Sequence, residues 1–251
     1  MADPSTDGGA TFHVDTRTEP AATVLAGFSG FGLAGLTAVD YLVDHLELEQ
    51  TGHIRAEGLP TITPFQEGKP RYPTRLYSRS DLDVTVLVGE LLVPVPIAEP
   101  FSNAILDWTG SKGVEEIAVL SGVPFPHGPN DHRAFYVASD DYVADHFSGD
   151  AAADVPPMGA GFLDGTNAAL MARGMESDLG VGVYVTPVHA LAPDVEATIR
   201  LLDAAESVYG LGIDTDPLQE FAEEVQQYYQ NLADRFEEQS EEEQPLDRMY
   251  M

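Results

Sequence analysis

The sequence has no cysteine, only two lysines and no long apolar run. Without cysteine the chain has no disulfide, no thiolate chemistry, and no zinc or iron-sulfur site with cysteine ligands. No apolar stretch approaches the ~18 residues of a membrane-spanning helix. The opening residues, MADPSTDGGA, also lack the charged and apolar parts of a signal peptide. We therefore expect a cytoplasmic protein.

Positive charge is scarce as well, because 12 lysines and arginines stand against 42 acidic residues, a formal net charge of -30. Only six of these acids lie within residues 237–247, so we expect acidity over the whole surface. Such a surface repels phosphate backbones and anionic membranes, and no basic stripe interrupts it. We therefore expect neither a nucleic acid nor a membrane as a partner.

The bias against lysine, alongside abundant Asp, Glu and Ala, is typical of proteins adapted to a salt-rich cytoplasm. We therefore expect a halophilic archaeon as the source. In molar salt the Debye length is about 3 Å, so the charge is screened and mainly keeps the surface hydrated and soluble. The charge by itself indicates little about a specific partner.

The pattern of apolar residues predicts alternating strands and helices, and 251 residues at 43% hydrophobic composition can bury a real core. Strands are expected at 23–26, 83–88, 116–123, 135–137 and 180–185, and helices at 33–46, 101–110, 167–174 and 193–210. Three prolines, Pro94, Pro96 and Pro100, predict a loop before the second helix, and residues 52–79 predict short strands with irregular connections. The alternation predicts an α/β fold, a three-layer α/β/α sandwich with a mainly parallel or mixed sheet.

We expect four parts along the chain. They are a disordered start (1–10), an α/β globular domain (11–215), a C-terminal amphipathic helix (216–236) and a flexible acidic tail (237–251). Asp216 as N-cap, Pro217 at the first helical position and Gln219 at capping-box spacing predict where the helix begins. Its apolar residues repeat at three and four positions, so this stripe packs on the domain, which we favour, or on a partner helix.

A glycine loop at residues 27–35 offers the main alternative interpretation. Gly30, Gly32 and Gly35 form G-x-G-x-x-G between a predicted strand and a predicted helix, and Glu57 follows about 20 residues later. Backbone N–H groups at such a helix start can hold an anion. Glycine is abundant in this chain, so we favour a tight strand-helix crossing. A nucleotide- or nucleoside-binding α/β enzyme that uses this loop is the alternative.

Other candidate chemistry is weaker. His127 and His132, with Asp131 between them, lie in a proline- and glycine-rich loop, which favours solvated imidazoles over a metal site. Ser29 and Ser121 lie beside glycines, but neither is in a G-x-S-x-G motif, and no histidine or acid partner can be assigned. We expect no catalytic residue, no cofactor and no metal.

The chain ends in Met249, Tyr250 and Met251, a hydrophobic residue, a tyrosine and a final residue. The preceding segment, EEQSEEEQPLD at 237–247, has Leu246 as its single aliphatic residue, so it cannot offset the entropy cost of ordering. This combination predicts a free segment whose tip docks on a partner.

Several blocks, taken in order, resemble the archaeal branch of the proteasome assembly chaperone family, relatives of proteasome assembly chaperone 2. The blocks are GFSGFGLAGLTAVDYLVDHL at 27–46, EPFSNAILDW at 99–108 leading into EEIAVLSGV at 115–123, GAGFLDGTNAALM at 159–171, and PDVEATIRLLDAAESVYGLGIDTDPL at 193–218. The resemblance implies an α/β/α fold like that of nucleoside phosphorylases without their catalysis. It also implies homo-oligomers that engage proteasome α subunits.

The resemblance also gives the chain's ending a role. Hydrophobic-Tyr-X (HbYX) tails in the family are implied to dock on the α ring of the core particle, and to assist its assembly or open its gate without ATP. Tyr250 would fill a pocket between α subunits, Met249 would pack beside it, and the Met251 carboxylate would pair with a lysine. We therefore expect a non-enzymatic chaperone or activator of the archaeal proteasome.

Overall fold

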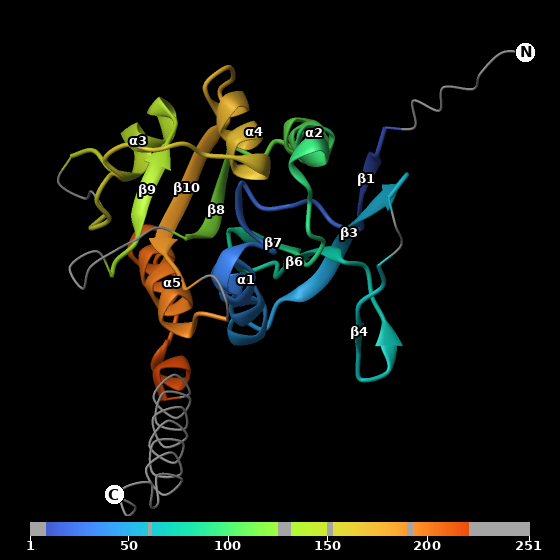
Figure 1. The fold of residues 1–251 in the computed structure, drawn as a ribbon, viewed down its shortest axis with the longest axis horizontal. Coiled ribbons are helices and arrows are strands. Elements are labelled where there is room, and N and C mark those ends of the chain that lie inside the picture. The colour runs from blue at the N-terminus through green and yellow to red at the C-terminus, as the bar shows by residue number, and fades with distance from the viewer. Residues whose placement is uncertain (1–8, 60–61, 125–131, 150–152, 190–192, 221–251) are drawn as a thin grey trace, which may run out of the picture. The chain divides into compact units, whose positions relative to one another are not determined.

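The computed structural model describes residues 9–59, 62–124, 132–149, 153–189 and 193–220 (Figure 1). The chain divides into two compact units, Met1–Ile213 and Asp214–Met251. The described part of the first unit contains an eight-stranded sheet in the order β1-β3-β6-β7-β2-β8-β10-β9. Its strands are β1 (Thr11–Thr16), β2 (Thr23–Phe28), β3 (Glu49–Glu57), β6 (Thr74–Ser78), β7 (Val84–Gly89), β8 (Glu116–Val123), β9 (Phe135–Ala138) and β10 (Gly180–Pro187). A separate hairpin joins β4 (Phe65–Gln66) to β5 (Lys69–Pro70).

The four central strands, β7, β2, β8 and β10, are parallel, and the strands on either side of them pair antiparallel. Every residue of β7 and of β10 is buried, as expected for strands covered on both faces. The predicted α/β fold with a mainly parallel or mixed sheet is confirmed in its mixed form.

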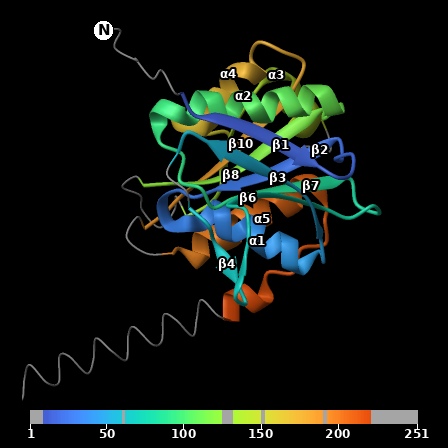
Figure 2. The ribbon, with the colours of Figure 1, turned by 90° about the vertical axis from the view of Figure 1, so that its right-hand side faces the viewer.

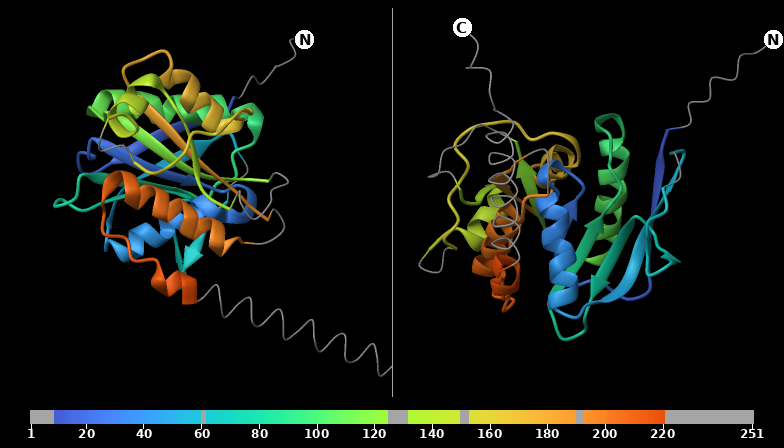
Figure 3. Two further views of the ribbon diagram at one scale, coloured as in Figure 1. Left: turned by 90° about the vertical axis from the view of Figure 1, so that its left-hand side faces the viewer. Right: turned by 60° about the horizontal axis from the view of Figure 1, so that its bottom comes forward.

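Helices cover both faces of the sheet (Figures 2 and 3). One face carries α1 (Ala34–His45), which follows the short 3-10 helix η1 (Phe31–Leu33), and α5 (Val195–Tyr209), while the other carries α2 (Val95–Lys112) and α4 (Gly165–Gly174). The short helix α3 (Asp140–His146) lies near β9 (Figure 1). Beneath α2 and α4, the core includes Val24, Phe101, Ile105, Ile117, Val119, Leu170 and Val183.

The start of α2 differs from the prediction. The helix begins at Val95, not near residue 101, and Pro96 lies in its first turn, where a backbone N–H has no helical partner in any case. Pro100 lies inside the helix and removes only one further donor. Prolines clustered near a helix start are therefore compatible with that start. The strand β1 and the helix α3 were also not predicted.

A buried tyrosine cluster ties α3 to β10 and α5. The hydroxyl of Tyr142 lies 2.8 Å from that of Tyr184 and 2.5 Å from that of Tyr209. Burial raises the pKa of Tyr142 and of Tyr184, so both hydroxyls stay neutral and serve as hydrogen-bonding groups. Gly182 makes room for this arrangement, because a Cβ there would lie 2.6 Å from the Tyr142 ring.

In the second unit, residues 216–220 are helical. The carbonyl of Thr215 accepts hydrogen bonds from the backbone N–H groups of Leu218 (3.0 Å) and Gln219 (3.1 Å). Thr215 is therefore the N-cap, one position before the predicted Asp216 cap, and Asp216 is the first helical residue.

Candidate interaction surface

The glycine loop serves the crossing of α1 over the sheet. A Cβ built on Gly35 would lie 1.9 Å from the carbonyl oxygen of Leu120 in β8, and one built on Gly27 would lie 2.1 Å from the carbonyl oxygen of Gly35. Gly32 has a φ of +63°, and its carbonyl accepts a hydrogen bond from the Asp194 N–H at 2.8 Å. The favoured interpretation, a tight strand-helix crossing, is confirmed.

Glu57, the acid expected to complete a dinucleotide fingerprint, does not lie near the glycine loop. Glu57 ends β3, and the order β3-β6-β7-β2 places two strands between it and the strand that leads into the glycine loop. Three strand spacings separate them by about 14 Å. Glu57 instead lies 3.5 Å from Arg55 Nε. The dinucleotide interpretation is therefore wrong in its geometry, since the acid and the loop do not share a site.

The remaining candidate residues do not assemble a reactive centre in the described part of the chain. Ser29 Oγ donates to the carbonyl of Glu90 at 2.9 Å, and Ser121 Oγ accepts from Asn167 Nδ2 at 3.0 Å. His132 is exposed, while His127 and Asp131 lie outside the described residues. Among the described residues, no three His, Asp or Glu side chains lie together as metal ligands, and no helix has the length and apolarity to cross a membrane.

The docking residues Met249, Tyr250 and Met251 also lie outside the described residues. Among the hollows in the described part of the chain are two that share Leu91. One, of about 430 Å³, opens where β2, β7 and β8 end, the edge at which parallel sheets commonly bind ligands. Its lining includes the exposed apolar residues Phe31, Leu92, Val95 and Phe162.

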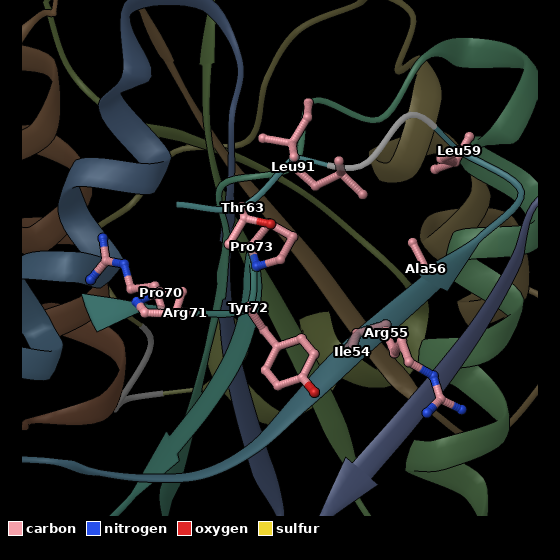
Figure 4. Close-up of a pocket in the computed structure, with 11 residues that line it drawn as sticks. Ile54, Arg55, Ala56, Leu59, Thr63, Pro70, Arg71, Tyr72, Pro73 and Leu91 are labelled. Atoms are coloured by element: carbon pink, nitrogen blue, oxygen red, sulfur yellow. The ribbon is translucent and has the colours of Figure 1, made fainter. Parts of the chain in front are cut away.

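The second hollow, of about 410 Å³, lies beside the β4–β5 hairpin (Figure 4). Its wall is mostly apolar and combines residues from β3 with the segments around β5 and after β7: Ile54, Ala56, Leu59, Ile62, Pro70, Tyr72, Pro73 and Leu91. Arg55 and Arg71 lie at opposite sides of it (Figure 4). The Tyr72 ring stacks on His53 with the ring centres 3.7 Å apart.

A buried ionic network fixes the base of this hollow. Arg75 in β6 is fully buried and donates to Glu90 Oε1 at 2.9 Å, to the Tyr72 carbonyl at 2.7 Å and to the Tyr77 hydroxyl at 2.7 Å. Arg71 donates to the same Glu90 oxygen. These hydrogen bonds give four nitrogens of the two guanidinium groups, three of Arg75 and one of Arg71, defined partners, which stabilises the backbone around Tyr72.

Asp40 joins the network from α1, with Oδ1 4.0 Å from Arg75 Nη2. Burial raises the pKa of Asp40 to about 6, although the nearby Arg75 opposes this shift. The Asp40 carboxyl therefore titrates at a pH at which most other carboxyls are already ionised.

Sequence reasoning did not identify Arg55, Arg71 or Tyr72 as surface residues of a common site. A signal was present, because residues 53–79 hold five of the 12 cations and only two of the 42 acids. The expectation of a uniformly acidic surface is corrected for this segment.

Comparison with known proteins gives the family. Residues 24–233 match the model of the PAC2 family. The crystal structure of PbaA from Pyrococcus furiosus, described as an archaeal homolog of proteasome-assembly chaperone, is similar with a TM-score of 0.82 at 18% identity, covering 96% of this chain and 100% of that chain. PbaB from the same organism, described as an archaeal proteasome activator, has a TM-score of 0.70 at 18% identity, covering 90% and 99%.

A protein of Methanocaldococcus jannaschii, described as uncharacterized, is 19% identical over 212 residues, which is 84% of this chain and 85% of that protein. The structural likenesses, at these identities, establish the fold, and the predicted resemblance to the archaeal chaperone family is confirmed. Because the family match spans residues 24–233, most of the sequence, this chain belongs to the PAC2 family.

Proposed function

We propose that this protein binds the proteasome core particle without catalysing a reaction, as an assembly chaperone or as an ATP-independent activator. The observation that carries the proposal is the match over nearly the whole of both chains to PbaA, a homolog of proteasome-assembly chaperone. The likeness to PbaB, described as a proteasome activator, supports the second of the two roles. In this proposal the protein is cytoplasmic and acts as a homo-oligomer.

The docking group in this proposal is Met249-Tyr250-Met251, which fits the hydrophobic-Tyr-X pattern. Tyr250 enters a pocket between neighbouring α subunits, where its ring is buried and its hydroxyl hydrogen-bonds, and Met249 packs beside it. A buried aromatic side chain with a polar tip is a common source of affinity at protein interfaces.

The described residues favour binding over catalysis. The glycine loop, Ser29 and Ser121 all have partners inside the fold. Glu57, the acid that a nucleotide-binding enzyme would need near the loop, lies three strands away.

The test is the peptidase activity of the cognate core particle in molar KCl, measured with the intact protein, with Tyr250→Ala and with Gln244→Ala. Gln244 lies in the same segment but outside the motif, so it controls for changes to the segment in general. We expect stimulation by the intact protein and by Gln244→Ala, and its loss in Tyr250→Ala.

An assembly role gives a different result: no stimulation, but co-purification of free α subunits that depends on Tyr250. If the intact protein neither stimulates the core particle nor retains α subunits, the proposed function is wrong. If Tyr250→Ala behaves as the intact protein does, the proposed docking group is wrong.

A further inference from the structure

Residues 53–79 have the opposite charge to the rest of the chain. The segment contains Arg55, Lys69, Arg71, Arg75 and Arg79 against Glu57 and Glu67, a formal charge of +3, which leaves -33 on the remainder. The Arg55 side chain is 53% exposed, and Lys69 is exposed. Arg75 is fully buried and shares Glu90 with Arg71, and Arg79 pairs with Asp81. The attraction that an acidic segment of another molecule meets here therefore comes from the two exposed cations, Arg55 and Lys69.

The same region exposes apolar side chains. Phe65 is 76% exposed, Ile62 is 58% exposed, and Tyr72 is 45% exposed. Ile62 and Tyr72 line the hollow of about 410 Å³, and Phe65 pairs with Pro70, which also lines it. This volume is within the range of pockets that bind ligands. We call Arg55, Ile62, Phe65, Lys69, Arg71 and Tyr72 the hairpin surface.

The hairpin surface is held in place before any partner binds. Glu67 (φ +50°) and Gly68 (φ +75°) form the two left-handed positions of a tight hairpin turn between β4 and β5. The Arg71 N–H donates to the Pro64 carbonyl at 2.9 Å, and the Arg71 guanidinium is bound to Gln66 and Glu90. Little ordering is therefore needed on this side of an interface, which favours affinity.

We propose that the hairpin surface binds residues 237–251 of a second copy of this chain. This segment, EEQSEEEQPLDRMYM, has six acids and one arginine, so its charge is opposite to that of the exposed Arg55 and Lys69. Its apolar residues Leu246, Met249 and Tyr250 are of the type that a mostly apolar hollow buries. Fifteen residues span up to about 50 Å when extended, which is ample reach for an association between copies.

The salt-rich conditions expected for this protein also favour an interface that combines charge pairs with apolar contacts. Molar salt screens long-range attraction and leaves only charge pairs at contact distance, while apolar burial persists. A surface that combines both contributions retains binding in molar salt, whereas a purely ionic one loses most of it.

The test uses zero-length carbodiimide cross-linking of the full chain in molar KCl, with equal amounts of natural-isotope and ¹⁵N-labelled protein. The reagent joins lysine amines to carboxylates, and the chain has only Lys69 and Lys112, so the products are simple to assign by mass spectrometry. Lys112 is the matched control, because it ends α2 and pairs with Glu19 at 3.0 Å. We expect links between Lys69 of one copy and the acids of residues 237–247 of the other, several-fold more abundant than any from Lys112 to those acids.

Two further measurements separate charge from apolar contact. Phe65→Ser, at an exposed position, should lower the Lys69 links several-fold without changing the melting temperature. An unlabelled peptide of residues 237–251 should suppress the links, whereas the same peptide with glutamines for its glutamates, or with serines for Leu246, Met249 and Tyr250, should not.

The proposal is overturned if Lys69 links are absent, occur only within one copy, are matched by those of Lys112, or persist unchanged in Phe65→Ser. It is also overturned if either altered peptide competes as well as the natural one. None of these readouts involves the proteasome. A negative cross-linking result therefore does not affect the proposed docking on the proteasome, and a negative peptidase result does not affect the proposed contact between copies.

If the proposed function holds, the hairpin surface also regulates docking on the proteasome; this part of the inference rests on that proposed function. A tail held by the hairpin surface of another copy is withheld from the α ring. Lys69→Glu should then stimulate the core particle at lower protein concentration than the wild type, while Lys112→Glu should not.

Discussion

Gly35 of α1 lies against Leu120 of β8 so closely that a Cβ at position 35 would be 1.9 Å from the Leu120 carbonyl oxygen. The contact involves backbone on both sides, so neither partner can yield by rotating a side chain. The distance between α1 and the sheet is thus fixed by the absence of a side chain at residue 35.

Gly35→Ala should therefore lower the free energy of unfolding by about 3 kcal/mol or more, because the helix must move off the sheet. Gly30→Ala is the control within the same motif, since a Cβ there would meet its nearest neighbour, the Phe28 carbonyl oxygen, only at 3.8 Å. Urea unfolding of both variants checks this. Equal losses in the two variants would contradict the assignment of Gly35 to the crossing.

Glu90→Gln should lower the free energy of unfolding more than most substitutions near the surface. It removes the carboxylate that Arg75 and Arg71 share, and Arg75 is fully buried, so a cation is left without its closest counter-charge. The expected cost is about 3 kcal/mol. Glu57→Gln, which removes an exposed pair with Arg55, should cost under about 1 kcal/mol. Similar melting temperatures for the two variants would refute the network's role.

Asp40 should give the protein a distinctive dependence on pH. Burial raises its pKa to about 6 in the folded protein, whereas in the unfolded chain it releases its proton near pH 4. The folded state thus binds more protons between these values, so this group makes the free energy of unfolding fall as the pH rises from about 4 to about 6. The side chain is 45% exposed, which limits the effect to under about 1 kcal/mol.

Asp40→Asn removes this contribution, so the variant should gain stability relative to the wild type between pH 4 and pH 7 in denaturant titrations. Asp81→Asn is a control of opposite sign, because a hydrogen bond from Arg79 lowers the pKa of Asp81. An Asp40→Asn curve parallel to that of the wild type would show that the carboxyl is not perturbed.

NAD or a nucleoside at millimolar concentration should leave the melting temperature unchanged. A ligand that binds the folded state must raise it, and the loop and acid that such a ligand would need lie three strands apart. A rise in the melting temperature that grows with ligand concentration would restore the nucleotide-binding alternative.

The strands and helices with strong local patterns were predictable from the sequence. The β8 strand was predicted at its observed bounds, and α5 ends at Gly210 as its sequence indicates. In contrast, α2 begins six residues earlier than predicted, because three prolines suggest a loop while the first turn of a helix tolerates them.

The hairpin surface could not be predicted in the same way. Ile54, Tyr72 and Leu91 meet only because β3 pairs with β6 and β6 pairs with β7. No spacing along the chain encodes those pairings. The charge of residues 53–79 was visible, but its meaning depends on which of the five cations are exposed, and Arg75 turns out to be fully buried.

The scarcity of lysine has a consequence for covalent modification. Lys69 and Lys112 are the only side-chain amines in the sequence, and Lys69 belongs to the hairpin surface. Any acylation or conjugation aimed at lysine has these two side chains as its targets. Neutralising Lys69 would remove one of the two exposed cations of residues 53–79, so a single modification would halve the exposed positive charge of the hairpin surface.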